Sequence, residues 1–220
     1  GLRLITDSAE ALGSTYLNNK IGSLGDASCF SFSPNKVLTT GQGGMIATND
    51  HKIYQNLLEL KDQGRPVRGT GGDDKHNSIG FNFKFTDIQA AVGIAQFNRL
   101  SDRINKAKLR DYWYRSNLKG IKGIKILGDN NYHDTTVTTW FDLLVEDRDK
   151  LIQELIGHNI GYRPFWFPLN TQPSYKNRSL YINSEEVSRS GLWLPSTFDI
   201  SKEDVDFICS IIEETTSSGT

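Results

Sequence analysis

The chain has 220 residues and a formal net charge of −1 at pH 7, from 25 Lys and Arg against 26 Asp and Glu. This length suits one large domain or two small ones. The balanced charge argues against a broad nucleic-acid surface, because phosphate neutralisation needs a basic excess. No apolar run approaches the ~20 residues of a membrane span. Two cysteines, Cys29 and Cys209, are too few for a disulfide framework and are typical of a reducing cytoplasm.

The first half of the chain alternates short strands with glycine-rich turns and then becomes helical. Short apolar runs predict strands, and an Asn-Asn pair between apolar residues predicts a small hairpin. Asp50 and Thr86 are typical helix N-caps, and the second begins the longest helical pattern, with a break near Ser101. The predicted strands cover residues 2–6, 27–32 and 45–48, the hairpin 16–21, and the helices 8–12, 50–63 and 86–118.

The second half begins after Gly120 and Gly123, where the pattern changes again. It contains predicted strands over residues 124–127, 135–145 and 160–163, and predicted helices over 147–156, 184–190 and 201–215. The last helix is amphipathic. We therefore expect an α/β protein with two domains, residues 1–118 and 119–220.

The chain opens with Gly1 instead of Met, and a predicted strand begins at once. The start has neither the charged residues nor the apolar stretch of a signal peptide. We therefore expect the chain to be a piece of a longer protein.

Chemically versatile residues follow two of the predicted strands. Asp7 ends the first strand, and Ser31 and Lys36 come at the end of the second and just after it. In open α/β sheets, ligands bind at the carboxyl ends of strands. A lysine there can bond to the aldehyde of pyridoxal phosphate, while a carboxylate keeps the pyridine nitrogen protonated. Taken singly, each has a simpler reading: Asp7 as a helix cap and Lys36 as a solvated surface residue.

Several sequence blocks resemble a known family. The blocks match in order from residue 1 to about 215 and are similar to those of the DegT/DnrJ/EryC1/StrS family of nucleotide-sugar aminotransferases. They are Asp7-Ser8-Ala9-Glu10-Ala11-Leu12-Gly13-Ser14, Gly22-Ser23-Leu24-Gly25-Asp26, Phe30-Ser31-Phe32-Ser33-Pro34-Asn35-Lys36, Thr40-Gly41-Gln42-Gly43-Gly44-Met45, Gly80-Phe81-Asn82-Phe83-Lys84-Phe85-Thr86-Asp87-Ile88-Gln89-Ala90-Ala91, Arg163-Pro164-Phe165-Trp166-Phe167-Pro168-Leu169 and Leu192-Trp193-Leu194-Pro195.

The resemblance implies the fold-type-I architecture of pyridoxal-phosphate transferases. Residues 1–118 would form the C-terminal part of the large three-layer α/β domain together with its long connecting helix. Residues 119–220 would form the smaller C-terminal α/β domain. Family members carry upstream a phosphate-binding turn and an aromatic residue that stacks on the cofactor ring. We expect this part to be missing from the chain.

The resemblance also assigns roles to single residues. Lys36 would be the lysine that bonds to the cofactor, Asp7 the partner of the pyridine nitrogen, and Ser31 a phosphate ligand. Asn82 matches an asparagine that reaches the cofactor phosphate of the partner subunit, which implies a homodimer with shared active sites. Glu10 stands where many members have Gln or His beside the ring hydroxyl and the substrate.

Further candidates for substrate binding are His76, Arg163 and Trp166. His76 lies in a glycine-rich loop and reads equally as an exposed residue. Arg163 suits a carboxylate or diphosphate through its planar guanidinium, or a structural salt bridge. Trp166 would stack on a nucleotide or sugar, although aromatic residues beside proline usually pack. The four histidines are widely spread and lie near no cysteine, so no metal site is expected.

The resemblance implies a pyridoxal-5'-phosphate enzyme of the cytoplasm that transfers an amino group from glutamate to a nucleotide-linked 4-keto-6-deoxy sugar. Lys36 disfavours the related dehydratases, which carry His there. The chain departs from the family at Lys84 and Phe85, where Arg-Met is usual, and at Asn170, where His is frequent. The alternative is a truncated, non-catalytic chain that serves as an assembly or sugar-nucleotide-binding module. Neither reading involves nucleic acid or a membrane.

Overall fold

The computed structural model describes residues 1–66, 75–128, 135–175 and 179–217. The chain folds into two compact units, residues 1–104 with 135–137 and residues 105–134 with 138–220. The division falls within helix α3 (Leu100–Asn117), earlier in the chain than the expected boundary after residue 118. None of the helices in the described parts is long and apolar enough to cross a membrane.

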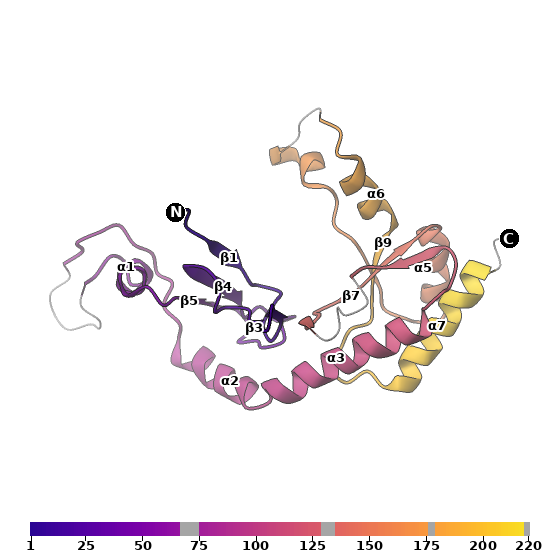
Figure 1. Cartoon of the computed structure of the whole chain (residues 1–220), viewed down its shortest axis with the longest axis horizontal. Helices are drawn as coiled ribbons and strands as arrows, with labels where there is room; N and C mark the ends of the chain where they lie inside the picture. Colours follow the sequence, from indigo (N-terminus) through magenta and orange to yellow (C-terminus); the bar gives the residue numbers. More distant parts are fainter. Residues whose placement is uncertain (67–74, 129–134, 176–178, 218–220) are drawn as a thin grey trace. The chain divides into compact units, whose positions relative to one another are not determined.

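The first unit is built on a three-stranded sheet with the order β1-β4-β5 (Figure 1). Strand β1 (Ile5–Asp7) runs parallel to β4 (Ala27–Ser31), and β5 (Gly44–Ala47) pairs antiparallel with β4. Strand β4 is the central strand and is covered on both faces, with Ala27, Ser28 and Phe30 buried. The strands predicted at 27–32 and 45–48 are thus confirmed to within one residue, whereas the first begins only at Ile5 and not at residue 2. The parallel pair places the carboxyl ends of β1 and β4 side by side.

The segment after β1 forms turns where a helix was predicted. The carboxylate of Asp7 accepts a hydrogen bond from Ala9 N at 3.0 Å, and Ala11 N donates to Ser8 O at 3.1 Å. Aspartate favours such turns because its side chain satisfies the backbone two residues on. The predicted hairpin is confirmed as β2 (Thr15–Tyr16) and β3 (Asn19–Lys20).

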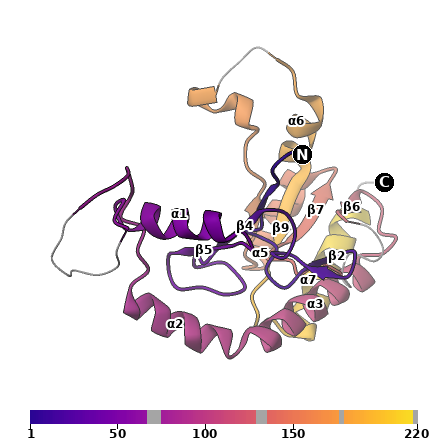
Figure 2. The ribbon, with the colours of Figure 1, turned by 60° about the vertical axis from the view of Figure 1, so that its left-hand side comes forward.

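The helices of the first unit begin where the caps predict. Asp50 accepts hydrogen bonds from Lys52 N and Ile53 N at the start of α1 (His51–Lys61). Thr86 and Gln89 form a capping box at the start of α2 (Asp87–Phe97). Helix α3 follows after a break at residues 98–99, which Figure 2 shows as a bend between the two helices.

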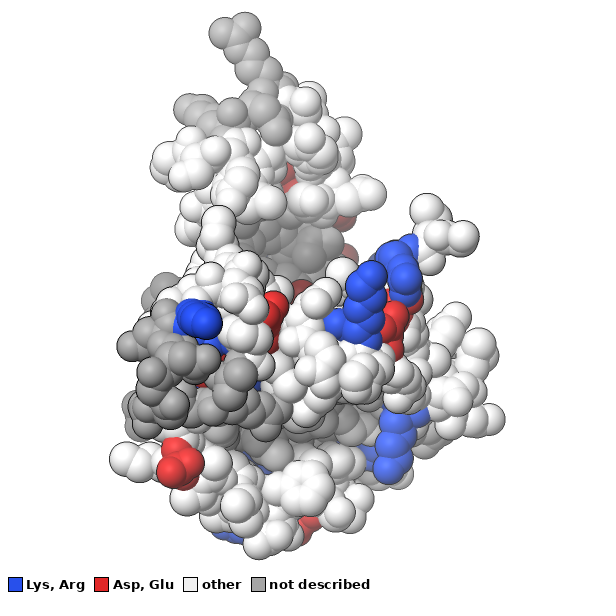
Figure 3. Space-filling model, turned by 90° about the vertical axis from the view of Figure 1, so that its left-hand side faces the viewer, with Lys and Arg blue, Asp and Glu red and all other residues white. Residues whose placement is uncertain are grey.

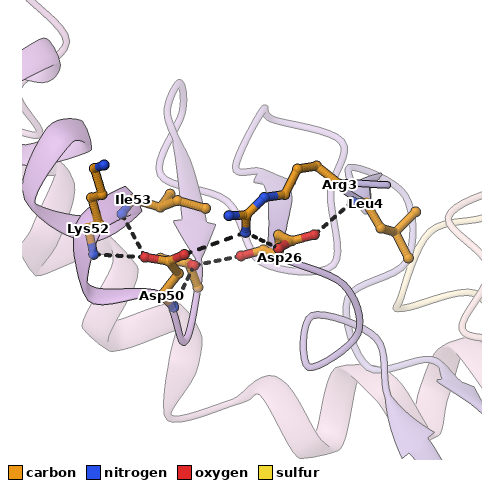
Figure 4. Close-up of polar contacts among 7 residues, drawn as sticks. Arg3, Leu4, Asp26, Asp50, Lys52 and Ile53 are labelled. Atoms are coloured by element: carbon orange, nitrogen blue, oxygen red, sulfur yellow. Dashed lines mark hydrogen bonds and ion pairs between the residues drawn. The ribbon is translucent and has the colours of Figure 1, made fainter. Parts of the chain in front are cut away.

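A cluster of charged residues links the three strands at the end of the sheet opposite to Asp7 and Ser31. Figure 4 shows Arg3 between the carboxylates of Asp26 and Asp50. Arg3 lies 2.5 Å from Asp26 and 3.6 Å from Asp50, while Asp26 also accepts from Leu4 N at 2.8 Å. These residues precede β1, precede β4 and follow β5, so the cluster joins the three strands away from Asp7 and Ser31.

The second unit contains an antiparallel sheet with the order β6-β7-β9-β8. The strands are β6 (Ile124–Ile126), β7 (Phe141–Val145), β8 (Arg163–Pro164) and β9 (Gly191–Leu194). The predicted strand 135–145 is strand only from Phe141, and β9 was not predicted. Its four residues are all buried, which leaves no alternation to detect. The remaining elements are α5 (Arg148–Gly157), α6 (Ile182–Ser190), α7 (Lys202–Ser217) and two 3-10 turns, Leu169–Thr171 and Pro173–Tyr175.

The core of the second unit lies between this sheet and helices α3, α5 and α7. Every second residue of β7 points into it, and the core side chains of α5 are Leu151 and Leu155. Arg110 of α3 is buried as well, and its guanidinium donates to Thr138 O at 2.6 Å and to Ser196 O. Burial lowers the pKa of Arg110 to about 10, so the guanidinium stays charged at neutral pH.

Charged side chains are scattered on the face drawn in Figure 3. There, Lys and Arg and Asp and Glu form small separate groups with uncharged atoms between them. This distribution agrees with the balanced composition.

Candidate active site

Asp7 and Ser31 lie at the carboxyl ends of strands β1 and β4, on the same end of the first unit's sheet. Asp7 pairs in register with Cys29, two residues before Ser31, and Ser8 N donates to Cys29 O at 2.8 Å. Asp7 Oδ1 accepts from Ala9 N, whereas Oδ2 accepts no hydrogen bond from the described residues. One carboxylate oxygen of the exposed Asp7 is therefore available to a ligand.

Lys36 lies in the loop that joins β4 to β5. The loop is held closed by Phe32 N, which donates to Gly43 O at 2.9 Å, and by Thr40 N, which donates to Phe32 O at 3.0 Å. The side chain of Lys36 is only 12% exposed, and its ammonium group forms an ion pair with Glu10. Glu10 follows β1, so this ion pair joins the segments that follow two parallel strands.

Two hydroxyl groups lie at the start of the same loop. Ser31 Oγ and Ser33 Oγ are 2.9 Å apart, and Ser33 N donates to Ser31 Oγ at 3.3 Å. The set therefore offers an amine, a carboxylate and two hydroxyl groups. These are the groups that bind the aldehyde, the pyridine nitrogen and the phosphate of pyridoxal phosphate, so the residues present fit this cofactor.

Asn82 and His76 lie near the carboxyl end of α1, in the same unit. Asn82 forms an isolated backbone bridge with Asp62, and its exposed amide makes no hydrogen bond to the described residues. His76 Nδ1 lies 2.7 Å from Gln63 O. Both residues lie in a different part of the unit from the Lys36 loop. Helix α2, which follows Asn82, contacts that loop, because Gln89 Nε2 donates a hydrogen bond to Gln42 O at 2.8 Å.

Arg163 and Trp166 belong to the second unit. The guanidinium carbon of Arg163 lies 5.5 Å from the ring centres of both Trp166 and Trp193, and no ion pair holds it among the described residues. Trp166 stacks edge-on against Trp193 and is 64% exposed. The cation–π contacts leave the edge of the guanidinium free for an anion.

Sequence reasoning did not single out Ser33 or Asp62. Ser33 is one of several serines in its sequence block, and only the folded loop brings its hydroxyl into contact with that of Ser31. Asp62 ends a helix and resembles any surface acid in the sequence, yet it is buried. The glycines at positions 64 and 80 are the signal in the sequence for the close backbone approach beside Asp62.

The α/β fold matches that of solved aminotransferases, for example one from Brucella abortus with a TM-score of 0.84 and 27% identity, covering 100% of this chain and 58% of that one. This places the chain in the fold class of the type-I pyridoxal-phosphate transferases. The model of the DegT/DnrJ/EryC1/StrS aminotransferase family matches residues 1–213. The chain belongs to this family, whose members are pyridoxal-phosphate-dependent aminotransferases.

Individual relatives agree with this assignment. The chain is 34% identical over 214 residues to GDP-perosamine synthase of Escherichia coli O157:H7, covering 97% of this chain and 58% of that protein. It is 28% identical to dTDP-4-amino-4,6-dideoxy-D-glucose transaminase of Shigella dysenteriae, covering 97% and 59%. The PLP form of Spr1654 from Streptococcus pneumoniae is similar in structure, with a TM-score of 0.84 and 25% identity, covering 98% of this chain and 58% of that one. The chain thus spans less than two thirds of the length of these relatives.

Proposed function

We propose that this chain carries the catalytic lysine of an aminotransferase that moves an amino group from glutamate to a nucleotide-linked 4-keto-6-deoxy sugar. The observation that carries the proposal is Lys36, whose largely buried amine lies at the strand-end edge beside Glu10. Burial restricts the rotamers of a lysine, so a bound aldehyde would meet its amine in a defined orientation.

Each residue of the edge has a distinct task in this proposal. Pyridoxal phosphate, when bound, supplies an electrophilic aldehyde and a ring that accepts electrons. Lys36 would bond to the aldehyde, Asp7 would hold the protonated ring nitrogen, and the Ser31 hydroxyl would donate to the phosphate. Glu10 faces the ring hydroxyl and the substrate. With its amine free, Lys36 would act as general base and acid, taking a proton from one carbon and returning it to another.

The names of the relatives support the proposed substrate class. Two of them carry a nucleoside diphosphate in their names, and one names a 4-amino-4,6-dideoxy sugar. Arg163 would pair with an anionic group of the substrate, and Trp166 would cover a base or sugar, because both present free surface. His76 is a further substrate-side residue.

We further propose a cytoplasmic homodimer in which Asn82 reaches the cofactor phosphate of the second copy. The free amide of Asn82 supports this assignment, since a donor is exposed there without a partner among the described residues. Residues 1–118 would then belong to the large domain and residues 119–220 to the small one. The alternative is a non-catalytic assembly or sugar-nucleotide-binding module.

Borohydride reduction in the presence of pyridoxal phosphate tests the proposal. We expect peptide mass spectrometry to find the reduced adduct on Lys36, and Lys36→Ala to abolish it while leaving the fold nearly intact. Lys20 and Lys61 serve as internal controls, because both are exposed. An adduct mainly on either of them, or none on any lysine, would favour the non-catalytic module.

A further inference from the structure

Two chain segments cross tightly where the chain leaves α1 and returns. A Cβ atom on Gly64 would lie 1.7 Å from Ser78 O, and one on Gly80 would lie 2.1 Å from Gly64 N. Asn77 N donates to Gly64 O at 3.0 Å. No side chain fits at either glycine, so the returning segment is held against the end of α1 by its backbone.

Asp62 lies at this crossing and binds two positively charged side chains, Arg65 from the segment that leaves α1 and Lys84 from the segment that returns. Its Oδ1 accepts from Arg65 at 2.7 Å and from Lys84 Nζ at 2.8 Å. The side chain is only 9% exposed. Hydrogen bonds from Lys84 and then Arg65 hold the pKa of Asp62 below its ordinary value, so the carboxylate is charged at neutral pH. Charge-assisted hydrogen bonds of this kind are stronger than neutral ones.

The backbone on both sides of Asn82 is fixed to the same helix end. Phe81 N donates to Leu60 O at 2.7 Å, and Phe83 N donates to Lys61 O at 3.0 Å. Asn82 itself bridges to Asp62. Asp62 therefore contacts the Asn82 segment twice, through its backbone and through Lys84, while the Asn82 amide remains exposed.

We propose that Asp62 is a positioning residue: by holding Lys84 and Arg65 together, its carboxylate sets the place of Asn82 for the cofactor phosphate of a second copy. This inference rests on the proposed function for its target. Lys84, which departs from the arginine usual in the family, keeps the positive charge that Asp62 needs. In this proposal Asp62 acts on the cofactor only through Asn82.

Amide hydrogen exchange of the 220-residue chain tests the positioning without any cofactor. In Asp62→Asn, we expect the amides of Phe81 and Phe83 to exchange roughly tenfold faster, because the segment opens locally more often. Lys84→Arg retains the ion pair and should keep their protection. Asp206→Asn, which also removes an aspartate–lysine pair at 2.6 Å, is the matched control in the second unit and should leave both amides unchanged. Equal protection in wild type and Asp62→Asn would overturn the inference.

Mixed dimers test whether Asp62 acts across the subunits. Asp62→Asn alone should need about tenfold more pyridoxal phosphate for half-maximal borohydride labelling of Lys36, the loss expected of one charged hydrogen bond. Co-expression with Lys36→Ala gives mixed dimers in which only the Asp62→Asn copy carries a lysine at position 36. The site of that lysine receives Asn82 from the other copy, whose Asp62 is intact. In these mixed dimers, half-maximal labelling of Lys36 should therefore return to the wild-type concentration of pyridoxal phosphate.

The outcomes separate the two proposals. If co-expression restores nothing, Asp62 acts only within its own copy and the inference is wrong. If wild type carries no adduct on Lys36, the proposed function is wrong, and the exchange of Phe81 and Phe83 alone decides whether Asp62 positions this segment.

Discussion

At the scale of single residues, the charged groups of the candidate site differ in the contacts that they already make within the protein. Lys36 pairs with Glu10 alone among the described residues, and Asp7 uses one carboxylate oxygen for a turn and leaves the other free. Asp62, by contrast, is buried and forms ion pairs with two cations, Arg65 and Lys84. The first two residues are therefore suited to bind a ligand, and the third to hold structure in place.

Asp7→Asn separates the catalytic role of this residue from its turn. Asparagine forms the same turn with Ala9 N, so we expect the unfolding midpoint and the labelling of Lys36 to stay near wild type. An amide cannot hold a protonated ring nitrogen, so the rate of amino-group transfer from glutamate to the bound cofactor should fall by about a hundredfold or more. Stopped-flow absorbance measures this rate. Near-wild-type transfer would mean that Asp7 serves only the turn.

At the scale of elements, the charged cluster at the far edge of the sheet makes the first unit sensitive to acid. Hydrogen bonds from Leu4 N and then Arg3 lower the pKa of Asp26, and those from Ile53 N and Lys52 N lower that of Asp50. Both carboxylates have folded-state pKa values below their ordinary 3.8. Their contribution to stability is thus complete above pH 3.8 and is lost as the pH falls through the folded values.

Urea unfolding at a series of pH values tests this assignment. We expect the midpoint of the first unit to fall below about pH 4, where the unfolded chain begins to bind more protons than the folded one. Asp26→Asn should lower stability at pH 7 and flatten this dependence, because the variant has one fewer carboxylate to protonate. Cys29 and Cys209 lie in different units, so alkylation of each thiol during unfolding reports on its own unit. An unchanged slope in Asp26→Asn would contradict the assignment.

At the scale of the whole molecule, the first unit leaves much apolar surface uncovered. Helix α2 buries no residue, and Ile88, Ile94 and Phe97 are 80%, 65% and 64% exposed. The segment before it exposes Phe81 and Phe83, whose rings stack 5.1 Å apart. An apolar surface of this extent on a water-facing helix marks an interaction site.

We expect the 220-residue chain to form a dimer or larger assembly through this surface and to bind pyridoxal phosphate weakly. Strand β1 is also an open edge with Leu4 and Ile5 exposed, and such edges pair with other chains. Sedimentation velocity over a wide concentration range measures the association, and Ile88→Lys with Ile94→Lys should weaken it. A monomer at all concentrations that binds one cofactor tightly would refute the expectation.

The sequence by itself determined the local elements and the chemistry of the strand-end residues. Caps such as Asp50 and Thr86 act over three or four residues, and strand ends are marked by the change from apolar to polar residues, so both can be read from short patterns. The motif blocks were sufficient to identify the family. What they could not show was that residues 8–12 form turns, because the hydrogen bond from Ala9 N to Asp7 competes with a helix that the composition also allows.

Only the tertiary structure decided which distant residues meet. The ion pair of Lys36 with Glu10 spans 26 positions, and that of Asp62 with Lys84 spans 22. Asp62 is buried because the chain segments at Gly64 and Gly80 pack closely beside it. Strand β9 is fully buried because other elements cover both of its faces. Contacts of this kind arise when separate elements pack, and no periodicity along the chain records them.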